Sequence, residues 1–429
     1  MRVSTAMIFG NGLASMQRQS AQLLHTQQQA ASGRRMLTPA DDPVASARAL
    51  EVGQAKNTNA LYQINQKTAA EALAQQESLL ASVGELMHDV RTLAVQGGGG
   101  SLNEADRRSI ASELRQRFEQ LVGFANAADG NGLYLFSGFM GGTKPFSGSV
   151  AAGVSYAGDD GQRLQQVSAS RQLAVSDSGN EIFMRIRNGN GSFVTSAAAT
   201  NAGSGVIDGG AVTDPAKWNA PGNGKDFSLR FAVDNSSVPP QTTYDIVDAS
   251  NNSLLTGLPS VGGPYPRVFT PGQAIVLKSQ GGEPAFDFGA QLVITGQPAN
   301  GDRFDIDAST SQSMFETLGR LIGALESSTG TPAGRTLLAN RIGAALTDID
   351  QAQDNLLRVR ATVGARLNEI DSLANAGEAL DLNYAQTLSR LQDVDYAEAI
   401  TRLTQQQFYL EAAQKTYASV SGLSLFNYV

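Results

Sequence analysis

The sequence predicts an α+β fold in which both chain ends form a long antiparallel α-helical coiled-coil bundle, with an all-β outer domain inserted between them. Two observations support this prediction. Of the 14 prolines, 11 lie between Pro145 and Pro298, so that residues 44–144 and 333–429 contain none. Because an interior proline removes a helical hydrogen bond, both stretches are free to form long helices. Between them, short β-branched and aromatic runs alternate with turn residues, as is typical of strands.

The first proline-free stretch is predicted to contain two helices. The first of them has apolar residues at spacings of four and three, which indicate one buried face: Leu79, Val83, Leu86, Val90 and Leu93. The four glycines at 97–100 are expected to end this helix. Asn103, with Asp106 three residues later, is typical of a helix N-terminus. The apolar face of the second helix is predicted to be Ile110, Leu114, Phe118 and Leu121.

The middle of the chain is predicted to consist of strands and turns. Its apolar and polar residues alternate over short runs that glycine, proline and asparagine bound. The runs lie at 166–175, 181–187, 227–233, 243–247, 273–278, 290–296 and 303–307.

The second proline-free stretch carries a seven-residue repeat, which is the spacing of a coiled coil. Its first position is occupied by Ile342, Ile349, Leu356, Val363 and Ile370. The second position holds Leu346 and Leu367 but also Gln353 and Arg360, so the seam is narrow. We therefore expect neighbouring helices, including the one around residues 79–93, to complete the core.

The two ends of the chain are predicted to be helices that do not fold alone. Near the C-terminus, Tyr396, Leu403, Leu410 and Tyr417 recur every seven residues, but the companion positions are Ile400, Gln407, Gln414 and Ser421. Because ordering a residue costs about 1–2 kcal/mol of backbone entropy, a half-polar seam stabilises an isolated pair too little. We expect neighbouring subunits to cover both arms. The candidate subunit-assembly residues are Leu13, Met16, Leu23, Ile400, Leu403, Leu410 and Tyr417.

This pattern predicts three nested domains, two of them discontinuous in sequence. Residues 1–45 with 385–429 form a terminal helical domain, the inner assembly layer. Residues 46–142 with 305–384 form a helical bundle, and residues 143–304 form the inserted β-rich domain. Residues 1–40 contain four arginines and no acid, whereas residues 376–429 contain six acids and three bases. The charges of the two arms are therefore complementary.

Composition argues against several classes of function. The net charge is −8, and no segment concentrates lysine and arginine residues. The chain therefore lacks the basic surface that binds the phosphates of nucleic acid. No stretch reaches the roughly 18 apolar residues that cross a bilayer, so we expect no membrane partner. The first thirty residues lack the apolar segment and cleavage site of a Sec signal peptide.

The sequence contains few of the residues that commonly act in catalysis. The chain has no cysteine, and its two histidines, His25 and His88, are 63 residues apart. The Asp-x-Asp pairs at 305–307, 348–350 and 393–395 fit strand or helix faces better than a metal site. We therefore predict no catalytic residue, no metal, no cofactor and no enzymatic activity.

Several strings resemble the bacterial flagellin family. The N-terminal 50 residues are similar to its conserved end, with Ser32-Gly33-Arg34-Arg35 followed by the segment from Pro39 to Pro43. VRTLAVQ at 90–96 and the segment after it resemble the next two helices of the family, and 358–373 and 393–429 resemble its C-terminal half. GLYLFSGF at 132–139, ITGQPANGDRFDI at 294–306 and the ending SLFNYV are more similar to the members that join hook to filament.

The resemblance implies a structural, extracellular component of the flagellum at the hook–filament junction. The implied partners are copies of the chain itself, forming an adaptor ring, with hook-associated protein 1 on one side and flagellin on the other. It also implies export by the flagellar type III apparatus and an export chaperone at the C-terminal helix. Opposite charges on the two arms would set register between neighbours.

Alternative functions stay open at this point. One is a filament flagellin with a β insertion. Another is a secreted adhesin or hydrolase whose insertion binds or cuts a glycan, with Trp218, Tyr244 and Tyr265 as binding candidates. Resemblance to flagellin also raises recognition by an innate receptor through Arg91 and its helix.

Overall fold

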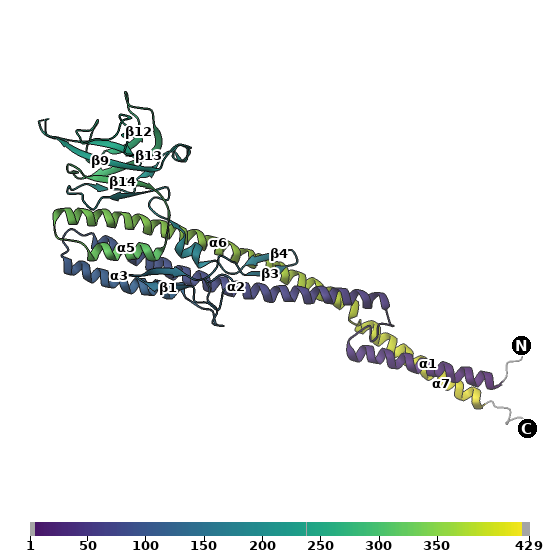
Figure 1. The fold of residues 1–429 in the computed structure, drawn as a ribbon. Helices are drawn as coiled ribbons and strands as arrows, with labels where there is room; N and C mark the ends of the chain where they lie inside the picture. The colour runs from purple at the N-terminus through teal and green to yellow at the C-terminus, as the bar shows by residue number, and fades with distance from the viewer. Residues whose placement is uncertain (1–4, 237, 423–429) are drawn as a thin grey trace, which may run out of the picture. The chain divides into compact units, whose positions relative to one another are not determined.

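The computed structural model describes residues 5–236 and 238–422 and confirms the α+β class (Figure 1). The long helices come from the two ends of the chain, and the strands lie between them. The helices are α1 (Thr5–Ser32), α2 (Pro43–Gly97), α3 (Glu104–Ala125), α4 (Pro215–Trp218), α5 (Met314–Glu326), α6 (Pro332–Gln392) and α7 (Tyr396–Gly422).

The chain forms two compact units. Unit 1 comprises residues 1–67, 166–171 and 371–429, and unit 2 comprises residues 68–165 and 172–370. The three-domain division drawn from the sequence stays a prediction.

The helical part of unit 2 has the apolar seam that the heptads predict. Ile342, Ile349, Leu356, Val363 and Ile370 of α6 are all buried. On α2, Val83, Leu86, Val90 and Leu93 are buried, whereas Leu79 is half-buried and Leu80 is buried beside it. The apolar face of α3 is confirmed as well, since Ile110, Leu114, Phe118 and Leu121 are buried.

The end of α2 and the start of α3 both lie where the sequence predicts them. Helix α2 ends at Gly97, within the glycine run. Helix α3 begins with a capping box, in which the Asn103 side chain accepts from the Asp106 N–H (2.9 Å) and the Asp106 carboxylate accepts from the Asn103 N–H (3.1 Å). This reciprocal pair satisfies donors that a helix N-terminus otherwise leaves without partners.

The insertion contains two antiparallel sheets and shorter strand pairs. The five-stranded sheet has the order β11–β10–β9–β14–β6, and the other has the order β12–β13–β7, with β8 also pairing with β13. Strand bounds in the first sheet are Arg267–Val268 (β11), Gln241–Asp248 (β10), Asp226–Asp234 (β9), Arg303–Ala308 (β14) and Phe193–Ala197 (β6). Those in the second are Ala274–Lys278 (β12), Asp287–Thr295 (β13), Val206–Ile207 (β7) and Ala211–Val212 (β8). The shorter pairs are β1 (Phe146–Ser149) with β2 (Gly153–Tyr156), β3 (Leu164–Ser168) with β4 (Arg171–Ala174), and β5 (Ile186–Arg187) with β15 (Ser311–Gln312).

The two larger sheets share one apolar core. Alternate residues of β9 and β14, such as Leu229, Phe231 and Phe304, belong to the same buried cluster as Leu277 of β12 and Leu292 of β13. Side chains from facing sheets interdigitate in this way in a β-sandwich.

Two of the predicted runs are not single strands. Residues 166–175 divide between β3 and β4, which pair with each other. Residues 181–187 are not a single strand, because Asn180–Met184 form a turn of π-helix before the short β5. Ile182 and Phe183 are consecutive and both buried, and the Phe183 ring lies 5.4 Å from that of Phe136. Two successive buried side chains do not fit the alternation of a half-exposed strand, so tertiary packing overrides the local pattern.

The sheets that contain β9, β12, β13 and β14 lie on one side of α6 (Figure 1), and polar side chains of that helix bind backbone groups of the insertion. Asn340 Oδ1 accepts from the Ile207 N–H (2.9 Å), and its amide donates to the Gly205 carbonyl (3.0 Å). About two turns later, Asp348 accepts from the Gly189 N–H (2.8 Å). These side chains satisfy buried backbone groups of the insertion, which fixes its position on the helix.

Unit 1 contains α1, α7, the first part of α2 and the last part of α6. The parts of α2 and α6 are joined by a buried hydrogen bond, in which the Asn59 amide donates to the Gly377 carbonyl (2.8 Å). No helix within the described residues combines the length and the apolar character that crossing a membrane requires.

Candidate assembly interface

Helices α1 and α7 form an antiparallel pair, which Figure 1 shows side by side. At one end of the pair, the Phe9 and Tyr417 rings meet edge to face at 6.0 Å. At the other end, the Val394 N–H donates to the Gly33 carbonyl (3.0 Å). Gly12 permits the close approach, because a Cβ there would lie 3.0 Å from the Tyr417 ring.

The facing side chains recur at spacings of three and four residues on both helices, which is coiled-coil spacing. On α1 they are Phe9, Gly12, Met16, Gln19, Leu23 and Thr26, and on α7 they are Ala399, Leu403, Gln406, Leu410, Ala413 and Tyr417. We call these residues the arm seam.

The arm seam contains no large buried apolar side chain. Among the described residues of α1 and α7, only Thr26, Gln29 and Ala399 are buried. Gln19 and Gln406 each hold a buried Oε1 without a hydrogen-bond partner. Because an unsatisfied buried acceptor costs about 1–3 kcal/mol, the pair gains little from its own packing.

The structure places the seven candidate assembly residues in two groups. Met16, Leu23, Leu403, Leu410 and Tyr417 lie half-buried in the arm seam. Leu13 and Ile400 lie outside it, with 49% and 56% of their surface exposed. Their role in contacts between copies stays a prediction.

The first three companion positions of the α7 repeat were predicted one residue too late, and the fourth, Ser421, lies outside the side chains that the structure describes. The seam uses Ala399, Gln406 and Ala413 instead of Ile400, Gln407 and Gln414. Alanine carries little apolar area and was not counted as a seam residue, but its small side chain lets two helices approach closely. The larger Ile400 is left facing solvent.

Unit 1 also exposes an unusual amount of apolar surface. More than half of the described large apolar side chains that stay strongly exposed lie in unit 1, which holds under a third of the chain. Large exposed apolar surfaces mark interaction sites. These side chains are Met7, Leu13, Leu24, Val44, Leu50, Leu61, Ile64, Leu380, Leu382, Tyr396, Ile400, Phe408 and Tyr409.

Sequence reasoning missed Phe408 and Tyr409, which are 67% and 49% exposed. Phe408 follows Leu403 by five residues, which places it about 140° around the helix from that seam position at 100° per residue. The sequence feature that could have indicated them is an aromatic residue outside the heptad seam, on a helix face that is otherwise polar.

The connection between α1 and α2 is shaped by the two aspartates of the TPADDP segment. Asp41 Oδ2 accepts from the Leu37 and Thr38 N–H groups, both at 2.8 Å, and Asp41 Oδ1 lies 3.1 Å from His25 Nε2. Hydrogen bonds from the Thr38 and Leu37 backbone hold the pKa of Asp41 below its usual value. Asp42 accepts from the Ala45 N–H (2.9 Å) and thereby caps α2.

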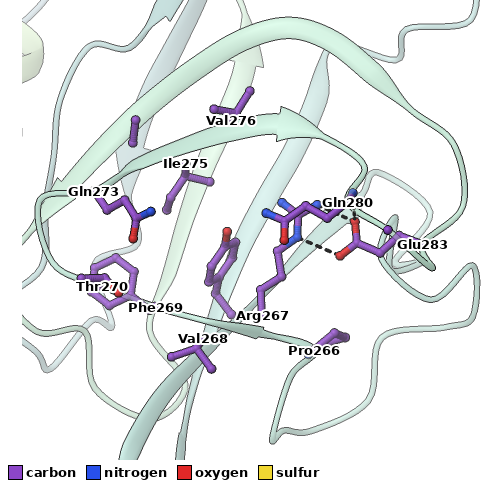
Figure 2. Close-up of a pocket in the computed structure, with 13 residues that line it drawn as sticks. Pro266, Arg267, Val268, Phe269, Thr270, Gln273, Ile275, Val276, Gln280 and Glu283 are labelled. Atoms are coloured by element: carbon purple, nitrogen blue, oxygen red, sulfur yellow. Dashed lines mark hydrogen bonds and ion pairs between the residues drawn. The ribbon is translucent and has the colours of Figure 1, made fainter.

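The insertion has an open cavity of about 610 Å³ between the edge strands β11 and β12. Figure 2 shows the Arg267 side chain beside Glu283, with Arg267 Nη2 2.5 Å from Glu283 Oε2. The hydrogen bond from Arg267 is the main cause of a lowered pKa at Glu283.

The three aromatic residues considered for glycan binding lie in different places. Tyr244 lines this cavity but is only 7% exposed, and Trp218 is buried in the core of the sandwich. Tyr265 is half-buried and does not line the cavity. The structure therefore does not bring them together.

Nothing among the described residues resembles a metal centre, since no three His, Cys, Asp or Glu side chains cluster there. Of the Asp-x-Asp residues, Asp305 pairs with Arg303, and Asp348 binds backbone of the insertion. Asp393 accepts from the Ser389 hydroxyl, and Asp395 accepts from the Ala397 N–H at the start of α7. These four aspartates have structural roles.

Two family models match the helical ends of the chain. The bacterial flagellin N-terminal helical region matches residues 3–140, and the bacterial flagellin C-terminal helical region matches residues 346–429.

Whole-length relatives match as well. The chain is 24% identical to flagellar hook-associated protein 3 of Escherichia coli K12, over 99% of both chains. It is 30% identical to the crystal structure of the flagellar junction protein FlgL from Legionella pneumophila, which covers 81% of this chain and all of that one with a TM-score of 0.69. Xanthomonas campestris FlgL is 32% identical and covers 79% of this chain and 99% of its own, with a TM-score of 0.66.

Proposed function

The chain belongs to the flagellar hook-associated protein 3 family, and on this premise we propose that copies of it form an adaptor ring through their terminal helices. It is a structural component of the bacterial flagellum at the junction between hook and filament. This function is favoured over that of a filament flagellin with a β insertion, because hook-associated protein 3 relatives match over the full length. Residues of unit 1 carry the assembly, and the role is structural with no catalytic step.

The single observation that carries the ring proposal is the surface of the α1–α7 pair. Its seam buries no large apolar side chain, while apolar side chains such as Leu24, Ile400 and Phe408 face solvent. Burying apolar surface gains about 25 cal/mol per Å², so neighbouring copies supply stability that the pair lacks alone. A head-to-tail contact of this kind closes into a ring when the rotation between copies permits.

The proposed neighbours of the ring are hook-associated protein 1 on the hook side and flagellin on the filament side. Both proposals come from the family to which the chain belongs. They are supported here by the match of both chain ends to the flagellin helical regions, since shared end structures allow successive components to stack by the same contacts.

We further propose export by the flagellar type III apparatus, with an export chaperone on α7. A pair of helices with a half-polar seam unfolds at low cost, which suits passage through a narrow channel. The exposed apolar residues of α7, including Ile400 and Phe408, need cover before assembly, and a chaperone provides it.

The ring proposal is tested by complementing a host strain that lacks the gene. Leu403→Asp places a charge in the arm seam and is expected to leave bare hooks with flagellin shed into the medium. Ile400→Asp is the sharper variant, because Ile400 is exposed in the single chain and its loss reports contact with another chain. Thr416→Asp, also on an exposed position of α7, is the control and should support swimming.

Electron microscopy of the cells and an assay of shed flagellin distinguish the outcomes. Filaments on hooks in the Leu403→Asp and Ile400→Asp strains would contradict assembly through these helices. Intact filaments in the deletion strain itself would contradict the junction role.

A further inference from the structure

A groove lies in unit 1 between the segment that leaves α1 and the first turns of α2. Its volume is about 390 Å³. Met36, Leu37 and Pro39 form one wall, and Leu50 and Gly53 lie on the other. We call it the connector groove. Leu50 is 66% exposed, so the apolar rim of the groove is not covered within the chain.

Gly53 is the feature of this groove that the single chain does not explain. It lies inside the long helix α2, where glycine costs roughly 0.5–1 kcal/mol relative to alanine. A Cβ at Gly53 would meet no atom within 4 Å, and its φ is not in the left-handed region. Neither packing nor backbone conformation within the chain therefore requires glycine, and the surface over Gly53 is open to a second chain.

Helix α7 carries a side chain of matching chemistry. Phe408 is 67% exposed and lies away from the arm seam, with the Tyr409 ring 6.3 Å from its own. Aromatic anchors that enter pockets dominate the energetics of many protein interfaces. An exposed aromatic ring and an open apolar groove therefore occur on the same unit.

Charge favours the same pairing. Arg34, at the rim of the groove, has no ion-pair partner within the described residues. Glu411 lies one helical turn after Phe408, is exposed, and pairs only with Lys415 of its own helix in the described chain. A ring that enters the groove would bring an acidic group toward this arginine.

We propose that Phe408 of a second copy binds in the connector groove, over Gly53, with Glu411 of that copy facing Arg34. The proposal rests on the proposed ring and specifies one contact within it. It is a head-to-tail contact, since the groove and the aromatic anchor are different surfaces of the chain.

The absence of cysteine allows a direct test in the assembled flagellum. Two single-cysteine variants, Gln54→Cys beside the groove and Thr404→Cys one turn before Phe408, are expressed together in the deletion strain. Isolated hook–filament complexes are then treated with a short thiol-specific cross-linker. We expect a covalent dimer, which can form only between copies. The control pair of Gln54→Cys with Thr416→Cys should give no dimer.

Further variants test the chemistry of the contact. Phe408→Ala, added to both cysteine variants, should lower the dimer yield at least about tenfold, as expected for an aromatic anchor. Arg34→Glu should lower it as well, and adding Glu411→Arg should restore it. Gly53→Leu should abolish the dimer without lowering the melting temperature of the isolated chain, whereas Gly123→Leu, at another open helical glycine, should change neither.

The outcomes separate this contact from the ring itself. Swimming cells whose cysteine variants give no dimer would overturn the groove contact and leave the junction role intact. A dimer that persists in Gly53→Leu would overturn it too. Failure of the deletion strain to lose its filaments would instead contradict the proposed function.

Discussion

A single carboxylate, Asp348, shows how burial and hydrogen bonding act together in this protein. Its two oxygens accept from the Gly189 N–H (2.8 Å) and the Gln312 amide (2.9 Å). Burial raises the pKa of Asp348, and these two hydrogen bonds oppose the rise. The Oε1 of Gln312 has no partner, so this polar cluster is not fully satisfied.

Asp348→Asn is expected to change the free energy of unfolding at pH 7 by no more than about 1 kcal/mol. The amide keeps an acceptor for Gly189 and removes the cost of burying a charge. Asp348→Leu instead leaves the Gly189 N–H without a partner and should cost about 1–3 kcal/mol. Urea unfolding followed by fluorescence of Trp218, the one tryptophan, measures both variants. Equal losses would contradict the prediction.

The raised pKa of Asp348 also predicts a pH dependence. Between the unfolded value of 3.8 and the higher folded value, the unfolded chain binds fewer protons than the folded chain. The contribution of Asp348 to stability therefore falls as the pH rises through that window. Asp348→Asn should remove this component, so the difference in unfolding free energy between variant and parent should shift in favour of the variant as the pH rises. A difference that does not change with pH would refute it.

At the scale of the elements, the capping box at the start of α3 can be tested by mutation. Asn103→Ala removes one half of the capping box and should lower the free energy of unfolding of unit 2 by about 1 kcal/mol. Asn103→Ser keeps an oxygen that accepts from the Asp106 N–H and should behave like the parent. Urea unfolding of the parent and the two variants measures these free energies. An Asn103→Ala variant with an unchanged free energy of unfolding would show that the cap does not contribute to stability.

Elements defined by repeated local patterns could be predicted from the sequence. The seam of α6 follows from Ile342 to Ile370 at every seventh residue, and the start of α3 follows from Asn103 and Asp106. In both cases the residues that specify the structure are close in sequence. These elements can therefore be explained from residues near one another in the sequence, without knowledge of the tertiary structure.

Other elements depend on contacts between distant residues, which a local pattern does not contain. Strand β14 pairs with β9 on one side and β6 on the other, across long stretches of chain. The π-helical turn at Asn180–Met184 depends on burial of Phe183 against Phe136 and Phe146. The connector groove likewise needs residues 34–39 to lie beside α2, so the sequence alone did not single out Gly53 or Phe408 as candidates for a contact between copies.

On the scale of the whole molecule, the two units differ in how they are stabilised. Unit 2 buries aromatic and aliphatic clusters in its helices and sheets, such as Phe118, Phe315 and Leu229. In unit 1 the described buried apolar side chains are Ala45, Ala49, Val167 and Ala399, three of them alanines. This difference supports the proposal that unit 1 gains stability from neighbouring copies, whereas unit 2 has a core of its own.

This difference predicts unequal hydrogen exchange along the isolated chain. Amides of α1 and α7 should exchange at least about 100-fold faster than amides around Ile349 and Leu356 of α6, because opening the pair exposes little apolar surface. Exchange followed by mass spectrometry measures both regions in one sample. In isolated hook–filament complexes, the same α1 and α7 amides should become protected, since neighbouring copies then cover Ile400 and Phe408. Equal protection of α1, α7 and α6 in the isolated chain would mean that the arms are stable alone, and assembly would then have to be driven by contacts elsewhere.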